Sequence, residues 1–499
     1  MITQWQASAN LTAYRDFRFD FLKQVEDTRT LPYLDSKQSP TVGVGFNLRD
    51  PNVRQEVFKA MKIDLTQISA TNTAALAAEQ GYINLLEAAI NLSYASGQNN
   101  ILRPNLDAVM FNRAHDPLLQ GFSHIAGRNT FEMNTTEMRT AFDALMPTYE
   151  NNVNTWLAGI PQSDERAALV SLAYNSRTGS TSLLGNNLRQ AIIDDKRAEA
   201  WFEIRYNSNR ERLTDPASAD GIAKRRYYEA EKFSLYSPGT GSVANSDAEA
   251  KAVFQMYTAH REHILTYESQ FGVNPGGTPG LRNMIAAANT DYALAGSAQV
   301  DTLVASLNPA KSFLVTNYAQ FAGAPAIDGE ILVGSDQRDT FDLQPVSIPG
   351  VPAHVFDLSK NDLMLGEGGD DFLRGRGGID VLYGGVGDDR LVGDAGNDFL
   401  FGGAGFDAYV YATGDGHDRI EDSDADGVIF VNGQMLSGGV KKAGHTDWES
   451  ADGTIKYVMQ GTDLVVKLNG TQIMTVIEDF QSGQFWTQPH DTAIEGMAA

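Results

Sequence analysis

Residues 366–410 read GEGGDDFLR, GRGGIDVLY, GGVGDDRLV, GDAGNDFLF and GGAGFDAYV, five consecutive nine-residue units close to the pattern G-G-x-G-x-D-x-U-x, where U is a large apolar residue. The pattern is typical of a parallel β-roll that binds calcium. Two imperfect units precede it: DLSKNDLML at 357–365 keeps the phase through Asp362, and GSDQRDTFD at 334–342 carries Asp339.

Each position that recurs from unit to unit in the repeat has a physical role. Glycine reaches positive φ at little cost, so the G-x-G segment can turn its carbonyls inward. There they join the aspartate carboxylate as hard oxygen ligands for calcium. We therefore predict calcium ligands at the repeat aspartates and at the first glycine of each unit: Asp362, Asp371, Asp380, Asp389, Asp398, Asp407, Gly366, Gly375, Gly384, Gly393 and Gly402.

The eighth position of each unit predicts the core of the roll. Leu373, Leu382, Leu391, Leu400 and Tyr409 recur every nine residues, so stacked coils would align them as one apolar ladder between two thin sheets. A disordered Gly/Asp-rich linker is the alternative. It explains neither the strict phase nor the apolar residue in every unit.

Negative charge is concentrated in the same region. The chain has 63 acidic and 39 basic residues, a net charge of −24, and the part from Ala326 onward has 30 acidic and 10 basic residues, a net charge of −20. These carboxylates repel one another without a cation, whereas calcium adds its binding free energy to folding. We expect the region to be disordered in low-calcium cytosol and to fold outside the cell. The charge argues against nucleic acid or an anionic membrane as the main partner.

The repeats resemble the repeats-in-toxin (RTX) family. This resemblance implies export from a Gram-negative cell through a one-step, type I channel that reads a C-terminal signal. The start of the chain, MITQWQASANLTAYRDF, shows no evident signal peptide. Delivery by a contractile injection machine or as a phage-associated protein is also compatible with the sequence. No run of about 18 apolar residues predicts a transmembrane segment, and the absence of cysteine excludes disulfides.

A second informative stretch lies near the N-terminus. Residues 21–48, FLKQVEDTRTLPYLDSKQSPTVGVGFNL, begin with helical spacing and continue as short apolar stretches broken by Pro and Gly. This predicts a helix that runs into a small irregular β-hairpin. Glu26 lies at the predicted helix end, and Asp35 and Thr41 lie in the hairpin. A cleft between the two elements could be lined by all three.

These residue types suit the hydrolysis of a glycoside. A glycosidase needs one carboxylic acid to protonate the leaving oxygen and a second carboxylate to manage the oxocarbenium-like centre or the attacking water. Glu26 and Asp35 could divide those roles, with the acid kept dry by Phe21, Leu22 and Tyr33. The Thr41 hydroxyl would orient the water.

The stretch resembles the phage-type lysozymes of glycoside hydrolase family 24. Their motif of Glu, Tyr-x-Asp and Thr-x-Gly-x-Gly appears here as Glu26, Tyr33, Asp35, Thr41, Gly43 and Gly45. The resemblance implies that Glu26 is the general acid and that Asp35 with Thr41 orients the water in an inverting hydrolysis. One departure is Phe46, because the family usually has histidine after the second glycine.

Two later segments resemble the same family. PQSDERAALVSLAYNSRTGSTSLLGNNLRQAI at 161–192 predicts a buried central helix that opens at Ser163 and Asp164. GIAKRRYYEAEKFSLY at 221–236 resembles the closing helix. The polar residues of these segments either contact substrate or tie helices together, and we favour the structural role. They are Arg166, Asn175, Arg225, Arg226 and Glu229.

The remaining residue patterns give weaker evidence of a functional site. The region from about 50 to 162 is longer than a compact family member needs, and it would extend or cap the cleft. His115 and His124 within it are more simply packed or solvated residues than ligands. His260 and His263 do not have the H-E-x-x-H spacing of zinc hydrolases, so an ordinary amphipathic helix is favoured. Serine-hydrolase, Walker and dinucleotide motifs are absent from the sequence.

We predict a multi-domain α+β protein. Residues 1–237 form a mainly helical lysozyme-like (muramidase) domain with a small β-hairpin, and 238–325 form a helical spacer. Residues 326–432 form the RTX β-roll, and 433–499 form a β cap of antiparallel strands with a secretion signal. A further ion site is predicted after the repeats, at Asp415, Asp418, Asp422, Asp424 and Asp426.

The predicted function is that of a secreted antibacterial peptidoglycan hydrolase with calcium as cofactor. It would cleave between N-acetylmuramic acid and N-acetylglucosamine in the periplasm or cell wall of a target bacterium. Peptidoglycan, the secretion machinery and an immunity protein are the expected partners. The alternatives are an adhesion or glycan-binding RTX protein with an inactive lysozyme-like domain, and a toxin directed at eukaryotic cells. No pore-forming apolar helix supports the toxin.

Overall fold

The computed structural model describes residues 1–499 except 27, 36–37, 97, 176–182, 209–215, 239–243, 245, 276, 320–325, 343–358, 425, 437, 442–443, 471 and 479–499. The chain divides into two compact units. The first, called here the N-terminal unit, comprises Met1–Gly239 and Pro279–Asp301; the second, the roll unit, comprises Thr240–Thr278 and Thr302–Ala499. The N-terminal unit is mainly helical and the roll unit mainly β, which confirms the predicted α+β fold class.

The N-terminal unit begins with the helix that the sequence predicted. Helix α1 (Leu11–Val25) starts at Asn10, whose side chain accepts the amide of Ala13, and ends at Glu26. Strands β1 (Arg29–Leu34), β2 (Pro40–Gly43) and β3 (Phe46–Asn47) follow as an antiparallel sheet in that order. The predicted hairpin therefore forms.

Helices make up the rest of this unit. They are α2 (Pro51–Ala60), α3 (Thr73–Ser96), α4 (Asn99–His115), α5 (Thr135–Trp156), α6 (Asp164–Asn175), α7 (Asn186–Ile193), α8 (Arg197–Phe202), α9 (Pro216–Phe233) and α11 (Met284–Asp291). Every residue of α6 from Glu165 to Ala173 is buried, so α6 is the central helix. In the long region after the hairpin, α3 and α4 pack against each other, and α4 also packs against β1.

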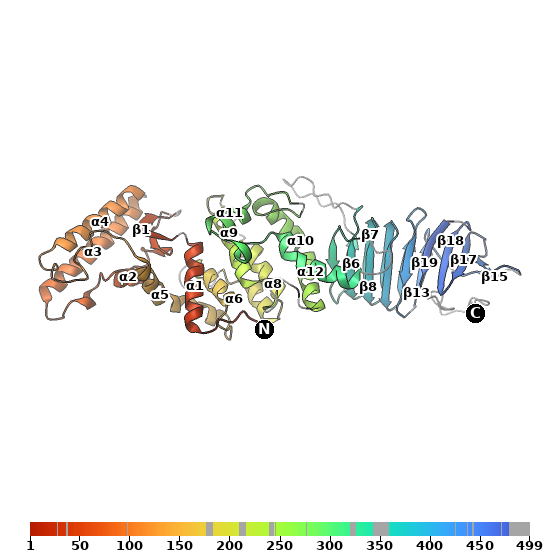
Figure 1. Cartoon of the computed structure of the whole chain (residues 1–499), viewed down its shortest axis with the longest axis horizontal. Helices are drawn as coiled ribbons and strands as arrows, with labels where there is room; N and C mark the ends of the chain where they lie inside the picture. Colours follow the sequence, from red (N-terminus) through yellow and green to blue (C-terminus); the bar gives the residue numbers. More distant parts are fainter. Residues whose placement is uncertain are drawn as a thin grey trace. The chain divides into compact units, whose positions relative to one another are not determined.

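The roll unit stacks parallel strands into two sheets (Figure 1). One contains β4 (Ile331–Val333), β6 (Leu363–Gly368), β8 (Val381–Val386), β10 (Phe399–Ala404) and β12 (Asp418–Glu421). The other contains β5 (Thr340–Asp342), β7 (Phe372–Gly377), β9 (Arg390–Ala395), β11 (Asp407–Tyr411) and β13 (Gly427–Val431). Successive units alternate between the sheets, so Leu382 pairs with Leu400 and Leu373 with Leu391.

The predicted apolar ladder is the core of the roll. Leu373, Leu382, Leu391, Leu400 and Tyr409 are each at most 2% exposed and belong to one cluster. Because the roll is only two thin sheets thick, this ladder excludes water along its whole length.

Both ends of the stack are covered. At the far end, β19 (Gln472–Ile477) pairs with β12, and β18 (Asp463–Leu468), β17 (Ile455–Gln460), β16 (Trp448–Glu449) and β15 (Val440–Lys441) continue the sheet as antiparallel strands. Strand β14 (Gln434–Met435) ends the other sheet. This is the predicted antiparallel cap. The predicted secretion signal at its end falls partly on residues 479–499, outside the described residues.

The segment predicted as a spacer is divided between the units. Helices α10 (Asp247–Phe271) and α12 (Leu303–Tyr318) belong to the roll unit, and α10 packs against β4 at the near end of the stack. The stretch between them, 279–301, belongs to the N-terminal unit. Among the residues that the structure describes, no helix is both long enough and apolar enough to span a membrane.

Candidate functional site

The repeat aspartates lie where each coil turns into the next strand. One carboxylate oxygen of each accepts a backbone amide two units back along the chain. The Asp371 amide donates to Asp389 Oδ1 over 2.8 Å, and the Asp389 amide donates to Asp407 Oδ1 over 2.9 Å. The Asp380 amide donates to Asp398 Oδ1 in the same way, also over 2.8 Å. The aspartates therefore form two columns, one along each edge of the roll.

The second carboxylate oxygen of these residues has no hydrogen-bond partner. This holds for the buried Oδ2 atoms of Asp371, Asp380, Asp389, Asp398 and Asp407, whose residues are each at most 2% exposed. A buried charged oxygen without a partner is costly unless a cation or proton neutralises it. The five orphaned oxygens therefore fit a bound cation.

Glycine lets carbonyl oxygens approach the same place. A Cβ on Gly384 would lie 2.8 Å from Asp389 Cγ and 2.6 Å from the carbonyl oxygen of Gly402 in the next coil of the same column. The other predicted glycines also lie against the aspartate of their own unit: Gly366, Gly375, Gly393 and Gly402. Carboxylate and carbonyl oxygens are the donors that calcium prefers. No three acidic, His or Cys side chains converge among the described residues, so a calcium ion held here would also need oxygen ligands from the backbone or from water.

Burial changes the protonation of these aspartates. It raises the pKa of Asp371, Asp398 and Asp407 to about 7, and neighbouring aspartates add to the effect. Burial raises the pKa of Asp380 to about 9 and that of Asp389 to about 6. Without a metal ion, protons therefore compete for these carboxylates near neutral pH.

The columns extend beyond the five regular units. Asp362 Oδ1 accepts the Glu330 amide over 2.6 Å, and Asp418 Oδ1 accepts the Asp398 amide over 3.1 Å. Asp418 was predicted only as one of five aspartates of a further ion site. Two others of that set take different contacts: Asp422 accepts the Tyr409 hydroxyl and Asp424 accepts the Gly405 amide. Asp418 thus continues the Asp362 column.

Columns of buried aspartates that pack against glycines in a parallel β-roll are typical of a calcium-binding solenoid. Residues 354–382 and 374–409 match the family model of the RTX calcium-binding nonapeptide repeat. The C-terminal region is therefore an RTX roll, and calcium is its ion, as predicted from the sequence. RTX repeat proteins are typically secreted, often by type I systems.

Among solved structures, the chain is similar to the solution structure of the AlgE6R3 subunit from the Azotobacter vinelandii mannuronan C5-epimerase. The two are 28% identical, and the match covers 31% of this chain and 78% of that chain with a TM-score of 0.12. No curated protein sequence matches this chain.

Glu26 lies between a helix end and the hairpin. Its backbone amide donates to Leu22 O and closes α1. Its carboxylate faces Gly45, where a Cβ would lie 2.6 Å from Glu26 Oε2. Gly45 also has a φ of +70°, so glycine is favoured there twice, by conformation and by space. Of the three residues predicted to keep Glu26 dry, Phe21 and Leu22 are buried and Tyr33 is partly buried.

A buried ionic network holds the other side of the Glu26 carboxylate. Arg225 of α9 forms an ion pair with Glu26 through Nη1 and donates from Nε to Glu229 Oε1 over 2.9 Å. Glu229 also pairs with Arg226 and accepts the Ser171 hydroxyl of α6 at 2.5 Å. Burial by itself would lower the pKa of Arg225, but Glu26 and Glu229 raise it above its usual value. Arg225 and Glu229 therefore tie α9 to α6, Arg226 pairs with Glu229 within α9, and Arg225 also positions Glu26.

Asp35 and Thr41 meet at the tight end of the hairpin. Asp35 Oδ1 accepts the Ser39 amide over 2.8 Å, and the Thr41 hydroxyl donates to Ser39 O over 3.0 Å. Thr41 is 3% exposed and pairs across the sheet with Tyr33. Phe46, the departure from the lysozyme motif, is buried with its ring against Gly43. The hairpin thus keeps its form without the usual histidine.

Two tyrosines complete the surroundings of Glu26. The rings of Tyr149 on α5 and Tyr174 on α6 lie 4.9 Å apart, and the Tyr174 hydroxyl donates to Val44 O over 2.7 Å. Burial and then the nearby charges of Asp50 and Glu26 raise the pKa of Tyr149 to about 12. Sequence reasoning missed Tyr149. No local pattern around Tyr149 indicates that it would lie near the Glu26 carboxylate.

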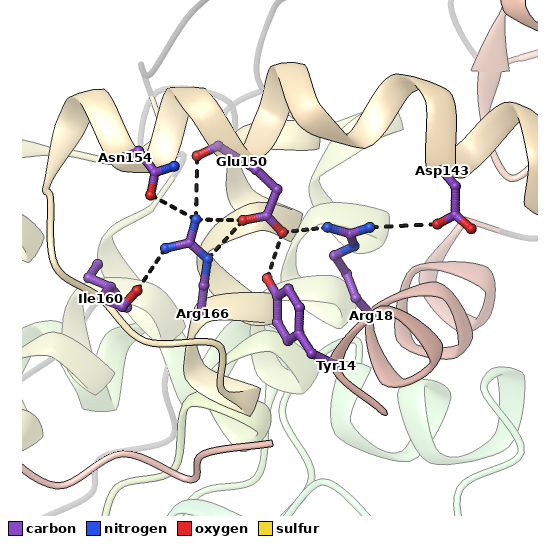
Figure 2. Close-up of polar contacts among 7 residues, drawn as sticks. All are labelled: Tyr14, Arg18, Asp143, Glu150, Asn154, Ile160 and Arg166. Atoms are coloured by element: carbon purple, nitrogen blue, oxygen red, sulfur yellow. Dashed lines mark hydrogen bonds and ion pairs between the residues drawn. The ribbon is translucent and has the colours of Figure 1, made fainter. Parts of the chain in front are cut away.

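Arg166 belongs to a separate polar cluster (Figure 2). Glu150 lies at its centre and accepts Arg166 Nε over 2.8 Å and the Tyr14 hydroxyl over 2.7 Å. Arg18 Nη1 also contacts Glu150, at 2.5 Å, and Arg166 reaches the carbonyl of Ile160 at 2.9 Å. The cluster borders a pocket of about 500 Å³ and joins α1, α5 and α6. The described contacts of Arg166 are thus those of a residue that ties helices.

The remaining candidates do not join these sites. Asn175 is the last residue of α6, and the segment that follows it at 176–182 lies outside the described residues. His115 stacks on Phe111 with ring centroids 4.1 Å apart, and burial lowers the pKa of His124 beside Phe122. His260 and His263 lie within α10. No cluster of three metal-ligating side chains occurs around any of them in the described part of the chain.

Proposed function

We propose that the N-terminal unit is a muramidase that hydrolyses the glycan strands of peptidoglycan between N-acetylmuramic acid and N-acetylglucosamine. The observation that carries this proposal is the contact between the Glu26 carboxylate and Gly45 of the hairpin that bears Asp35 and Thr41. A helix-end carboxylate thereby faces a hairpin with a second carboxylate and a hydroxyl. This is the pair of groups that an acid/base glycosidase requires.

In the proposed reaction, Glu26 donates its proton to the glycosidic oxygen as the bond from that oxygen to the anomeric carbon breaks. A water molecule attacks the same carbon from the opposite face. Asp35 accepts the proton of this water, and the Thr41 hydroxyl orients it. Attack from the opposite face inverts the anomeric configuration. Arg225 holds the Glu26 carboxylate in place. Burial raises the pKa of Tyr149 and of Tyr174, and both rings lie near enough for the Glu26 charge to raise it further.

In the same proposal, the roll is a folding and export module. The aspartate columns would hold calcium between coils, and calcium would supply the free energy that folds the acidic region outside the producing cell. Secretion through a type I channel is supported by the RTX repeats. Delivery by a contractile injection machine remains the alternative route. The target would be the periplasm or cell wall of a competing bacterium, with an immunity protein protecting the producer.

A second candidate function is glycan binding without cleavage, for adhesion. The observation in its favour is that both functional groups already have partners, since Glu26 is ion-paired with Arg225 and the Thr41 hydroxyl donates to Ser39 O. In that case the lysozyme-like domain would bind glycan and would not hydrolyse it. The two candidates agree on the roll and differ only in turnover.

Hydrolysis of labelled peptidoglycan by the purified full chain in calcium distinguishes them. We expect the wild type to release muropeptides and Glu26→Gln to be slower by about a thousandfold, because general-acid catalysis is removed. Glu56→Gln, on the surface of α2 and paired with Lys59, serves as a matched control and should equal the wild type. Binding without release of muropeptides, or equal rates for Glu26→Gln and wild type, would refute the muramidase proposal.

A further inference from the structure

Helix α11 returns to the N-terminal unit from within the roll unit. The chain leaves the N-terminal unit near Gly239, enters the roll unit with α10, returns as Pro279–Asp301, and enters the roll unit again with α12. Both ends of the α11 segment are therefore covalently continuous with helices of the roll unit. Any change in the order of α10 and α12 alters the freedom of the segment between them.

The α11 segment is anchored on α9. Ile285 and Ala288 are buried. Asp291 forms an ion pair with Lys224 of α9 at 2.7 Å, and the Lys224 ammonium lies 5.2 Å from the centre of the Tyr292 ring. Lys224 directly precedes Arg225, the partner of Glu26. The segment thus packs beside the part of α9 that reaches Glu26.

An aromatic stack continues from this segment to α1. The Tyr292 ring lies 5.4 Å from the Tyr228 ring of α9, which lies 5.2 Å from the Phe21 ring of α1. The Tyr228 hydroxyl donates to Gln24 Oε1 at 2.5 Å, two residues before Glu26. Burial raises the pKa of Tyr292, and the charges of Arg225, Glu229 and Glu26 act on its hydroxyl. Tyr292 therefore supports the packing of α9 against α1, the helix that ends at Glu26.

Helices α10 and α12 pack against each other, and both also contact the roll. Arg261 of α10 pairs with Glu330 at 2.8 Å, and Gln255 donates to Gly334 O at 2.6 Å. The ring of Tyr318 on α12 lies 5.3 Å from that of Tyr383 in the roll. If the roll is unfolded, the faces of α10 and α12 that cover it lose their burial. The ordered anchors on both sides of the α11 segment then become mobile.

We infer that Tyr292 is a positioning residue for the Arg225–Glu26 pair, and that calcium binding to the roll is coupled to this pair through the α10–α11–α12 segment. The inference rests on the proposed muramidase function, because its expected consequence is that the rate of peptidoglycan hydrolysis depends on calcium. A folded roll holds both ends of the α11 segment, which lowers the entropic cost of docking Tyr292. Coupling is reciprocal, so docking of α11 also favours the calcium-bound roll.

Hydrogen–deuterium exchange of the full chain tests the coupling without reference to activity. Calcium should slow exchange of residues 284–291 by about tenfold relative to chelator, together with residues 303–318. Helix α6, which lies at the centre of the N-terminal unit, should change little. If calcium protects the roll while residues 284–291 exchange equally in both conditions, the coupling is refuted.

Kinetics of Tyr292→Ala and Tyr292→Phe test the positioning role. Tyr292→Ala in saturating calcium should lower kcat about tenfold and leave KM within about twofold, because a misplaced acid affects the transition state more than substrate binding. Tyr292→Phe keeps the ring and should recover most of the rate. Equal rates for Tyr292→Ala and wild type, or equal impairment of both variants, would contradict the role. A wild type that cleaves no peptidoglycan refutes the proposed function, and the exchange of residues 284–291 then decides the coupling by itself.

Discussion

Asp389 and Asp407 lie in successive coils of one column, joined by a hydrogen bond of 2.9 Å from the Asp389 amide to Asp407 Oδ1. The second oxygen of each is buried without a partner. Each of the five regular units therefore has one carboxylate oxygen that accepts a hydrogen bond and one buried oxygen without a partner, beside its glycines. This arrangement makes the cation part of the fold, since the orphaned oxygens have no other means of neutralisation than a proton.

Asp389→Asn should weaken calcium-driven folding. The neutral amide removes one charged ligand from the middle of a column, so the calcium midpoint for strand formation should rise by about tenfold or more. Circular dichroism during a calcium titration measures it. Asp388→Asn changes the adjacent, exposed aspartate, and its midpoint should stay near that of the wild type. Indistinguishable midpoints for the two variants would argue against Asp389 as a ligand.

Stability in chelator should depend on pH in the direction opposite to calcium affinity. The folded pKa values of about 6 to 9 for Asp389, Asp371 and Asp380 exceed the ordinary unfolded value of about 4. The folded, calcium-free roll then binds more protons than the unfolded chain. Its stability is fully present below the unfolded pKa and is lost as pH rises through the folded values.

Circular dichroism in chelator at pH 5 and pH 8 measures that dependence, and the strand content of the calcium-free chain should be greater at pH 5. Calcium titrations at pH 6 and pH 8 provide the complementary measurement. Affinity should be higher at pH 8, because calcium displaces fewer protons there. A chelated roll that gains stability between pH 5 and pH 8 would show that the aspartates are not buried in the calcium-free state.

Gly45→Ala should reduce hydrolysis without affecting the roll. The new Cβ would lie 2.6 Å from Glu26 Oε2. The alanine would also have to keep the backbone φ of +70°, which costs about 1 kcal/mol for a residue other than glycine. The Glu26 carboxylate must move away from the hairpin, so kcat should fall. Gly121→Ala is the control, because nothing lies within 4 Å of a Cβ at that position. Full activity of Gly45→Ala would mean that contact between Glu26 and Gly45 is not needed.

Arg225→Met should destabilise the N-terminal unit. Removal of one partner from a buried ion-pair network costs about 3 kcal/mol, because Glu229 loses part of its compensation. Arg103→Met breaks an exposed pair with Asp107 and should cost less than about 1 kcal/mol. Chemical denaturation of the two variants compares them. Similar losses would indicate that the Arg225 network contributes no more than a surface pair.

Much of the roll could be predicted because its information is local. Each nine-residue unit contains its own turn, its own aspartate and its own core residue, so the position of Leu391 follows from its neighbours in sequence. The hairpin around Glu26 was predictable for a similar reason, since the helix end, proline and glycines all lie within residues 21–48. The partners of Glu26 on other elements were less accessible. Arg225 was singled out only as a residue that ties helices or contacts substrate, and Tyr149 was not singled out at all.

The sequence by itself determined the repeat period, the ligand types and the placement of the acidic charge, because glycine conformation, carboxylate chemistry and apolar periodicity act over a few residues. Only the tertiary structure decided that strands pair between alternate units and that the segment 279–301 returns to the N-terminal unit. Contacts such as Tyr292 with Tyr228, and Arg225 with Glu26, join positions far apart in the chain. They form because burial of apolar and charged faces is settled by the packing of whole helices, which no local pattern encodes.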